Sequence, residues 1–284
     1  MTVKRVGVVG SGIMGSGIAE TAAKNGHEVV LRSREQATAD GMMAGLEKSL
    51  AKQVEKGKLA EDERIAVLAR IQATSDLGEL ADCDLVIESI VEDIAAKRHL
   101  FNELDRICHE NTILATNTST LPVIELAMET GRPDKVCGVH FFNPATVMAL
   151  VEVVRPLTAS DATIDECVAF AQACGKQPVV VKDQAGFIVN ALLFPYLNNA
   201  VRLLESGVAT KEDIDSAMKG GCGFPMGPFA LLDLVGLDTS LSILDALYDE
   251  FRDPNYAPVP LMRRMVTAEL LGRKTNRGFY DYHR

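Results

Sequence analysis

The chain has 284 residues, of which 47% are hydrophobic, so it is long enough for two modest domains with substantial cores. Its formal net charge of −10 leaves no broad basic face for nucleic acid or an anionic membrane surface. The six cysteines are scattered without a C-x-x-C pair, which indicates reduced thiols and neither a disulfide framework nor a metal site. No apolar run approaches ~18 residues and no signal-peptide pattern opens the chain, so we expect a cytoplasmic protein without a membrane span.

The first predicted elements are a strand, a glycine loop, a helix and a second strand. Valines at positions 6, 8 and 9 form a β-branched run that is typical of a buried strand. The loop after it has the G-x-G-x-x-G pattern, which indicates dinucleotide binding when it joins a strand to a helix. We expect the pyrophosphate at the helix N-terminus, where unpaired N–H groups favour an anion; a glycine turn that binds no nucleotide is the alternative. The residues expected to contact the dinucleotide here are Gly10, Ser11, Gly12, Ile13, Met14 and Gly15.

Residues 36–70 are charged and helical in period, and we expect a helical excursion there before the sheet resumes at residues 84–89. The later predicted strands cover residues 112–119, 135–142, 150–156 and 178–182. Helices are predicted between them, over residues 94–108, 122–130 and 161–174. This alternation predicts an α/β fold with a Rossmann-type, doubly wound and mostly parallel sheet, which forms a dinucleotide-binding domain over residues 1–183.

From residue 184 the strand patterns stop and amphipathic helical patterns follow one another. Thr210 is expected to cap one helix, and Pro195 to kink an earlier one. We therefore predict a second, all-helical C-terminal domain over residues 184–284. We expect it to take part in substrate closure and in dimerisation.

Three polar residues near predicted strand ends are candidates for acid–base chemistry. His140 lies at a strand end, and Glu152 lies twelve residues later in a neighbouring strand, within reach of the imidazole. A carboxylate on one ring nitrogen makes the other a better base, because it stabilises the imidazolium. Ser119 ends the strand "LATNTS", and ligands of open α/β sheets bind at such carboxyl ends. A His–Glu pair is also a common structural hydrogen bond, and the residues alone leave both interpretations open.

Taken together and in order, eight stretches resemble the 3-hydroxyacyl-CoA dehydrogenase family, close to its 3-hydroxybutyryl-CoA members, over essentially the whole chain. They are "GVVGSGIMGSGIA", "DLVIESIVEDIAAK", "NTST", "GVHFFNP", "MALVEVV", "KDQAGFIVN", "GGCGFPMGPFALLDLVGLD" and "GRKTNRGFYDY". The resemblance implies reversible oxidation of an L-3-hydroxyacyl-CoA to the 3-oxoacyl-CoA with a nicotinamide cofactor. It also implies a homodimer.

The resemblance implies roles for individual residues. His140 would be the catalytic acid/base and Glu152 its partner, while Ser119 and Asn190 would hold the substrate oxygen. Further positions match residues that lie along the cofactor: Glu92, Lys97, Asn117, Ser119 and Asn143. Two positions in the helical excursion match residues that contact the coenzyme A nucleotide: Ser49 and Lys56.

One stretch, "VVLRSRE", departs from the pattern of the family. Most relatives end the second strand with an acid that accepts hydrogen bonds from the adenosine ribose, but this chain has Arg32 there, followed by Ser33 and Arg34. Guanidinium groups bind a 2′-phosphate with charge-assisted hydrogen bonds, whereas a carboxylate repels it. We therefore expect NADP(H). If Arg32 instead stacks on adenine or points to solvent, NAD(H) is the alternative.

Other functions remain open at this point. A related dehydrogenase acting on a 3-hydroxy acid without coenzyme A, or on an acyl-carrier-protein thioester, is the nearest alternative. An inactive binding relative is a second one, although the joint presence of Ser119, His140, Glu152 and Asn190 argues against it.

Overall fold

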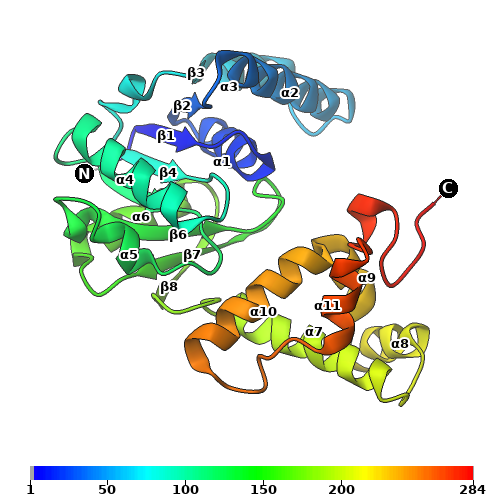
Figure 1. Ribbon diagram of the computed structural model, residues 1–284. Helices are drawn as coiled ribbons and strands as arrows, with labels where there is room; N and C mark the ends of the chain where they lie inside the picture. The colour runs from blue at the N-terminus through cyan, green and yellow to red at the C-terminus, as the bar shows by residue number, and fades with distance from the viewer. Residues whose placement is uncertain (1–2, 284) are drawn as a thin grey trace. The chain divides into compact units, whose positions relative to one another are not determined.

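The computed structural model describes residues 3–283, which divide into two compact units, one ending at Asp183 and the other beginning at Gln184 (Figure 1). No helix within the described residues is long and apolar enough to cross a membrane. Five of the cysteines are buried and free, and Cys222 is free and exposed.

The first unit is built on one eight-stranded sheet with the order β3-β2-β1-β4-β5-β6-β7-β8. Strands β1 to β6 are parallel; β7 runs antiparallel to β6, and β8 is parallel to β7. The strands are β1 (Arg5–Val9), β2 (Glu28–Arg32), β3 (Ile71–Thr74), β4 (Leu85–Glu88), β5 (Ile113–Thr116), β6 (Val136–Phe141), β7 (Leu150–Arg155) and β8 (Gln177–Lys182). The order reverses between β1 and β4, which is where doubly wound sheets bind their ligands.

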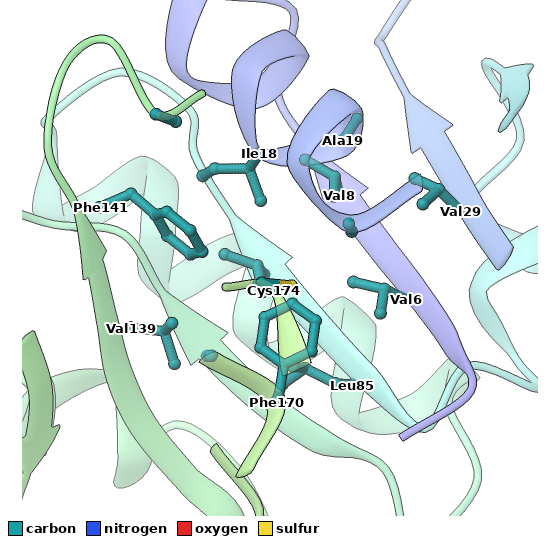
Figure 2. Close-up of a cluster of buried hydrophobic side chains, with 14 of the residues drawn as sticks. Val6, Val8, Ile18, Ala19, Val29, Leu85, Val139, Phe141, Phe170 and Cys174 are labelled. Carbon is teal, nitrogen blue, oxygen red and sulfur yellow. The ribbon is translucent and has the colours of Figure 1, made fainter. Parts of the chain in front are cut away.

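Helices cover both faces of this sheet, and their apolar residues form its core. One face packs against α1 (Ile13–Lys24), α2 (Gln36–Glu55), α3 (Glu61–Ala69) and α6 (Asp161–Ala173). The other face carries α4 (Ile94–Ile107) and α5 (Val123–Ala127), as Figure 1 shows. In Figure 2, Ile18 of α1 and Phe170 of α6 lie over side chains of β1 and β6, among them Val8 and Phe141. The mostly parallel, doubly wound sheet predicted from the sequence is confirmed.

Two details differ from the prediction. The sheet resumes at β3, residues 71–74, and not at residues 84–89; this edge strand, "IQAT", is only partly buried and has one large apolar residue, so it lacks an apolar run. Strand β5 ends at Thr116, so Ser119 does not end the strand but lies in the loop after it. The expected helical excursion is present as α2 and α3.

The second unit is helical, with α7 (Val189–Glu205), α8 (Lys211–Cys222), α9 (Pro228–Val235), α10 (Leu237–Phe251) and α11 (Pro260–Thr267) around its own core. Thr210 caps α8, as predicted, because its side chain accepts a hydrogen bond from Asp213 N.

Two buried carboxylates hold the C-terminal residues. Asp233 accepts hydrogen bonds from Phe279 N, Tyr280 N and the Tyr282 hydroxyl, at 2.9, 2.8 and 3.0 Å. Asp215 accepts from two backbone N–H groups of α9 and from the Tyr280 hydroxyl.

Candidate active site

The glycine loop between β1 and α1 has the geometry of a phosphate cradle. Gly10 has a φ of +141°, and a Cβ there would lie 2.2 Å from Ser89 O. A Cβ on Gly15 would lie 2.2 Å from Gly10 O, so glycine allows helix and loop to pack this closely. A Cβ on Gly12, in contrast, would meet nothing within 4 Å. The loop therefore packs tightly against backbone atoms at Gly10 and Gly15, and its open side is at Gly12.

The open side of the loop coincides with the N-terminus of α1. Gly12 is the N-cap and no side chain caps the helix, which leaves first-turn N–H groups for a ligand. Ser11 and Gly12 are exposed, and Ile13 is 78% exposed. A cradle that presents helix N–H groups at the switch point between β1 and β4 fits the pyrophosphate of a dinucleotide.

Arg32 ends β2 directly beside this loop, since Gly10 N donates to Arg32 O at 3.0 Å. Its guanidinium is half-buried, its Nε donates to Ser75 O at 3.3 Å, and burial lowers its pKa from the ordinary value. Arg34 is exposed, whereas Ser33 is only 3% exposed. Of the three residues expected at a 2′-phosphate, the two arginines are therefore the more accessible.

His140 and Glu152 are directly opposite each other in the antiparallel pairing of β6 with β7, on the same face of the sheet. His140 Nδ1 lies 2.8 Å from Glu152 Oε2, and both side chains are almost completely buried. His140 Nε2 lies 3.2 Å from Ser119 Oγ. The Phe142 ring packs at 4.5 Å from the imidazole, centroid to centroid. The imidazole is thus held by a carboxylate on one nitrogen and faces a serine hydroxyl with the other.

The loop that carries Ser119 is held along its length. At its start, Asn117 Oδ1 accepts from Phe141 N at 2.8 Å, which ties the loop to β6 next to His140. In its middle, Glu92 accepts from Ser119 N at 2.9 Å and from the Thr118 hydroxyl. At its end, Asp183 accepts from Val123 N and Ile124 N, at 3.0 and 2.7 Å. Burial raises the pKa of the Asp183 carboxyl above its ordinary value.

The remaining predicted residues fall into separate groups. Lys97 is 1% exposed, and its ammonium pairs with Glu88 at 2.6 Å and with Glu92 at 3.2 Å. Asn143 is exposed just after β6. Asn190 lies in the first turn of α7 in the second unit and is buried.

A groove of about 570 Å³ opens between the glycine loop, α2 and the segment after β6. Ser49 lines it together with Gly12, Ser16, Gly45 and Pro144. Lys56 does not line it; this residue follows the end of α2 and is exposed. The described residues contain no group of His, Cys, Asp and Glu that could hold a metal ion.

Sequence reasoning missed two residues of this region. Glu88 ends β4 beside the switch point and is completely buried. An acid at the carboxyl end of an apolar strand, here the last letter of "LVIE", is a signal that could have drawn attention to it. Asp183 acts on a loop 60 residues earlier in the chain, and no local pattern predicts that contact.

Comparison with known proteins identifies the family of both units. The family model described as "3-hydroxyacyl-CoA dehydrogenase, NAD binding domain" matches residues 5–184, and "3-hydroxyacyl-CoA dehydrogenase, C-terminal domain" matches residues 186–282. A 3-hydroxybutyryl-CoA dehydrogenase of Clostridioides difficile is 48% identical over 280 residues, 99% of this chain and 100% of that protein.

Two crystal structures are similar along their whole length. FadB2 of M. tuberculosis is 47% identical with a TM-score of 0.97, and all of both chains is covered. The (S)-3-hydroxybutyryl-CoA dehydrogenase PaaH1 of Ralstonia eutropha is 43% identical, also with a TM-score of 0.97 and full coverage of both chains. With both family models matched in order and these identities over the full length, the chain is an oxidoreductase that belongs to the 3-hydroxyacyl-CoA dehydrogenase family.

Proposed function

We propose that this protein interconverts an L-3-hydroxyacyl-CoA, with 3-hydroxybutyryl-CoA as the first candidate, and the 3-oxoacyl-CoA. The relatives named 3-hydroxybutyryl-CoA dehydrogenases support this substrate class. The observation that carries the proposal is the imidazole of His140, held by Glu152 at 2.8 Å and facing Ser119 Oγ at 3.2 Å.

In this proposal His140 is the acid–base group. During oxidation its Nε2 takes the proton of the C3 hydroxyl, and during reduction it returns a proton to the C3 oxygen. The buried Glu152 carboxylate holds Nδ1 and stabilises the imidazolium that forms. Ser119 holds the substrate oxygen and favours the developing alkoxide, and the resemblance to the family assigns Asn190 to the same oxygen. When bound, the nicotinamide ring accepts or supplies the hydride.

The cofactor would be held by residues of the first unit. The glycine loop, Gly10 to Gly15, would receive the pyrophosphate at the N-terminus of α1. Asn117 and Glu92 would lie toward the nicotinamide, because they bind Phe141 N and Ser119 N beside His140. Asn143, two residues after the end of β6, would lie there too. The buried Lys97 would act there through Glu92.

We propose NADP(H) as the preferred cofactor, with NAD(H) as the alternative. Arg32 is fixed beside the loop by the Ser75 carbonyl, and Arg34 is exposed next to it. Two guanidinium groups, with an arginine as the last residue of β2 in place of an acid, favour a 2′-phosphate. Ser33 is buried, so we assign it a smaller part than the arginines.

The groove lined by Ser49 is the proposed entry for the thioester arm, because residues of the glycine loop and Pro144 line it together with Ser49. Lys56, exposed at the end of α2, would meet a phosphate of the coenzyme A nucleotide outside the groove.

We further propose a homodimer formed by the helical unit, where Leu192 on α7 is 71% exposed and Leu234 on α9 is 49% exposed. Light scattering after size exclusion tests the dimer. A cytoplasmic location remains a prediction from the sequence.

The first experiment mixes the purified protein with acetoacetyl-CoA and compares kcat/KM for NADPH and NADH by absorbance at the dinucleotide band. We expect turnover with a clear NADPH preference that Arg32→Asp reverses. Arg264→Asp makes the same charge change on α11 and should leave the preference unchanged. An NADH preference in the unmodified protein would refute the role of Arg32 alone. Absence of turnover with either dinucleotide would refute the proposed reaction.

A further inference from the structure

Glu88 is a carboxylate completely removed from water at the end of β4. Its Oε1 accepts from Lys97 Nζ and from Ile90 N, both at 2.6 Å, and its Oε2 accepts from the Thr116 hydroxyl at 2.7 Å. Burying an ion pair costs free energy that its own attraction often fails to offset. The position of such a pair under the active-site loop therefore requires an explanation beyond stability.

Lys97 connects this buried carboxylate to the surface of the site. Its side chain is 1% exposed, and its ammonium lies between Glu88 and Glu92, which is 40% exposed. Glu92 in turn accepts hydrogen bonds from Ser119 N and from the Thr118 hydroxyl. A second path runs through Thr116, whose hydroxyl donates to Glu88 and accepts from Thr118 N at 3.1 Å. Both paths end in the loop that holds Ser119 Oγ 3.2 Å from His140 Nε2.

We infer that Glu88 is a positioning residue: through Lys97 and Glu92 it fixes the Ser119 loop against His140. The inference rests on the proposed function for its kinetic consequence, but the contacts themselves do not depend on it. Without the Glu88 charge, Lys97 is a buried ammonium with one half-exposed partner, and it gains by moving toward water. Glu92 then loses the cation that orients it, and Ser119 loses its fixed place.

The test separates positioning from stability with two variants of the same pair. Glu88→Gln removes the charge and keeps nearly the same shape. It should lower the Tm and reduce kcat by about 10²-fold, which is the loss that a misplacement of about 1 Å causes at a reacting centre. The double variant Glu88→Gln/Lys97→Met removes both charges and should recover the Tm, because a buried pair is often replaced without loss of stability. Its kcat should stay low, because Glu92 still lacks its anchor. Kcat is measured at saturating dinucleotide, and the dinucleotide Kd is followed by its fluorescence.

The matched control is Asp105→Asn. It breaks a partly buried pair at the other end of α4, where Asp105 Oδ1 lies 2.7 Å from Arg132 Nε. This variant should lower the Tm and leave kcat unchanged. If kcat of the double variant recovers together with its Tm, or if Glu88→Gln lowers only the Tm, the positioning role is refuted.

A readout without turnover keeps this inference apart from the proposed reaction. The chain has five histidines, so the ring nitrogens can be followed by ¹⁵N-histidine NMR and those of His140 assigned with His140→Gln. We expect the Nε2 resonance of His140 to move in Glu88→Gln and in the double variant, and to stay in place in Asp105→Asn. An unmoved resonance would refute the inference. Lack of turnover by the unmodified protein would refute only the proposed reaction.

Discussion

Both units bury carboxylates, but the partners of these carboxylates differ. In the sheet unit, Glu152 contacts His140 and Glu88 contacts Lys97, so each of these two acids near the candidate site is joined to a basic group. In the helical unit, Asp215 and Asp233 accept only from backbone N–H groups and tyrosine hydroxyls among the hydrogen bonds described for residues 3–283.

The difference separates two uses of the same buried group. A carboxylate that accepts hydrogen bonds from several fixed N–H groups is stabilised in its charged form, and it holds a chain segment in place. Burial raises the pKa of the Tyr282 hydroxyl, so it stays a donor to Asp233 at higher pH than an exposed tyrosine would. A carboxylate that faces an imidazole or an ammonium instead controls the position and charge of that group. The first use holds the fold together, and in the function we propose the second use positions groups for chemistry.

The largest effect should come from His140→Ala. Loss of the acid–base group should reduce kcat by ~10²–10⁴-fold, the usual value of general acid–base catalysis, while dinucleotide binding stays nearly unchanged. Stopped-flow reduction of acetoacetyl-CoA and titration of dinucleotide fluorescence measure the two quantities. A variant with nearly full activity would contradict the assignment of the base.

Glu152→Gln should have a smaller effect on the same step. The amide keeps a hydrogen-bond partner opposite Nδ1 but removes the charge that stabilises the imidazolium, so we expect a loss in kcat of about 10²-fold, the lower end of the same range. The dinucleotide Kd, followed by fluorescence, distinguishes this loss from misfolding, because a correctly folded first unit should keep its affinity for the dinucleotide. An unchanged kcat would make the pair a structural hydrogen bond.

Asp233→Asn tests the structural side of the comparison. The N–H₂ group of the asparagine would face Phe279 N or Tyr280 N, which now donate to a carboxylate. The helical unit should therefore lose about 1–3 kcal/mol of stability, with no change in kcat of the folded protein. All five tyrosines lie at or after position 196 and the chain has no tryptophan, so tyrosine fluorescence in a urea titration reports on this unit. A drop in kcat without a loss of stability would reverse the assignment.

The smallest effect concerns the stability of the sheet unit at low pH. His27 is 7% exposed, and burial lowers its pKa from the ordinary value of 6.5. Because the unfolded state takes up the proton first, the stability that this residue contributes is complete above pH 6.5 and falls as the pH decreases toward its folded-state pKa. The Tm difference between the unmodified protein and His27→Gln should therefore shrink from pH 8 to pH 5.5. These two pH values lie about 1 pH unit or more on either side of the ordinary histidine pKa. A difference that grows on acidification would contradict the sign.

Much of the fold follows from local pattern. The valine run before Gly10, the glycine loop and the repeated strands and helices predict a doubly wound sheet, because backbone sterics and periodic burial act within a few residues. The end of the strand pattern near residue 183 predicts the helical unit. Strand β3, "IQAT", lies at the edge of the sheet and is only partly buried, so it lacks the apolar run that indicates β4 and β5. Ser119, His140 and Glu152 were found as candidates from their types and their places near strand ends.

How these residues contact one another depends on the tertiary fold. The antiparallel register of β6 and β7 sets Glu152 opposite His140, and a shift by one residue would turn one of them to the other face. The loop of Ser119 is held by Glu88, Glu92 and Asp183, which come from three other segments of the chain. Hydrogen bonds between distant segments depend on packing of the whole sheet, and no local sequence signal encodes their geometry. Residue types and their order along the chain therefore establish which groups are available for chemistry, and the folded sheet brings particular pairs of them into contact.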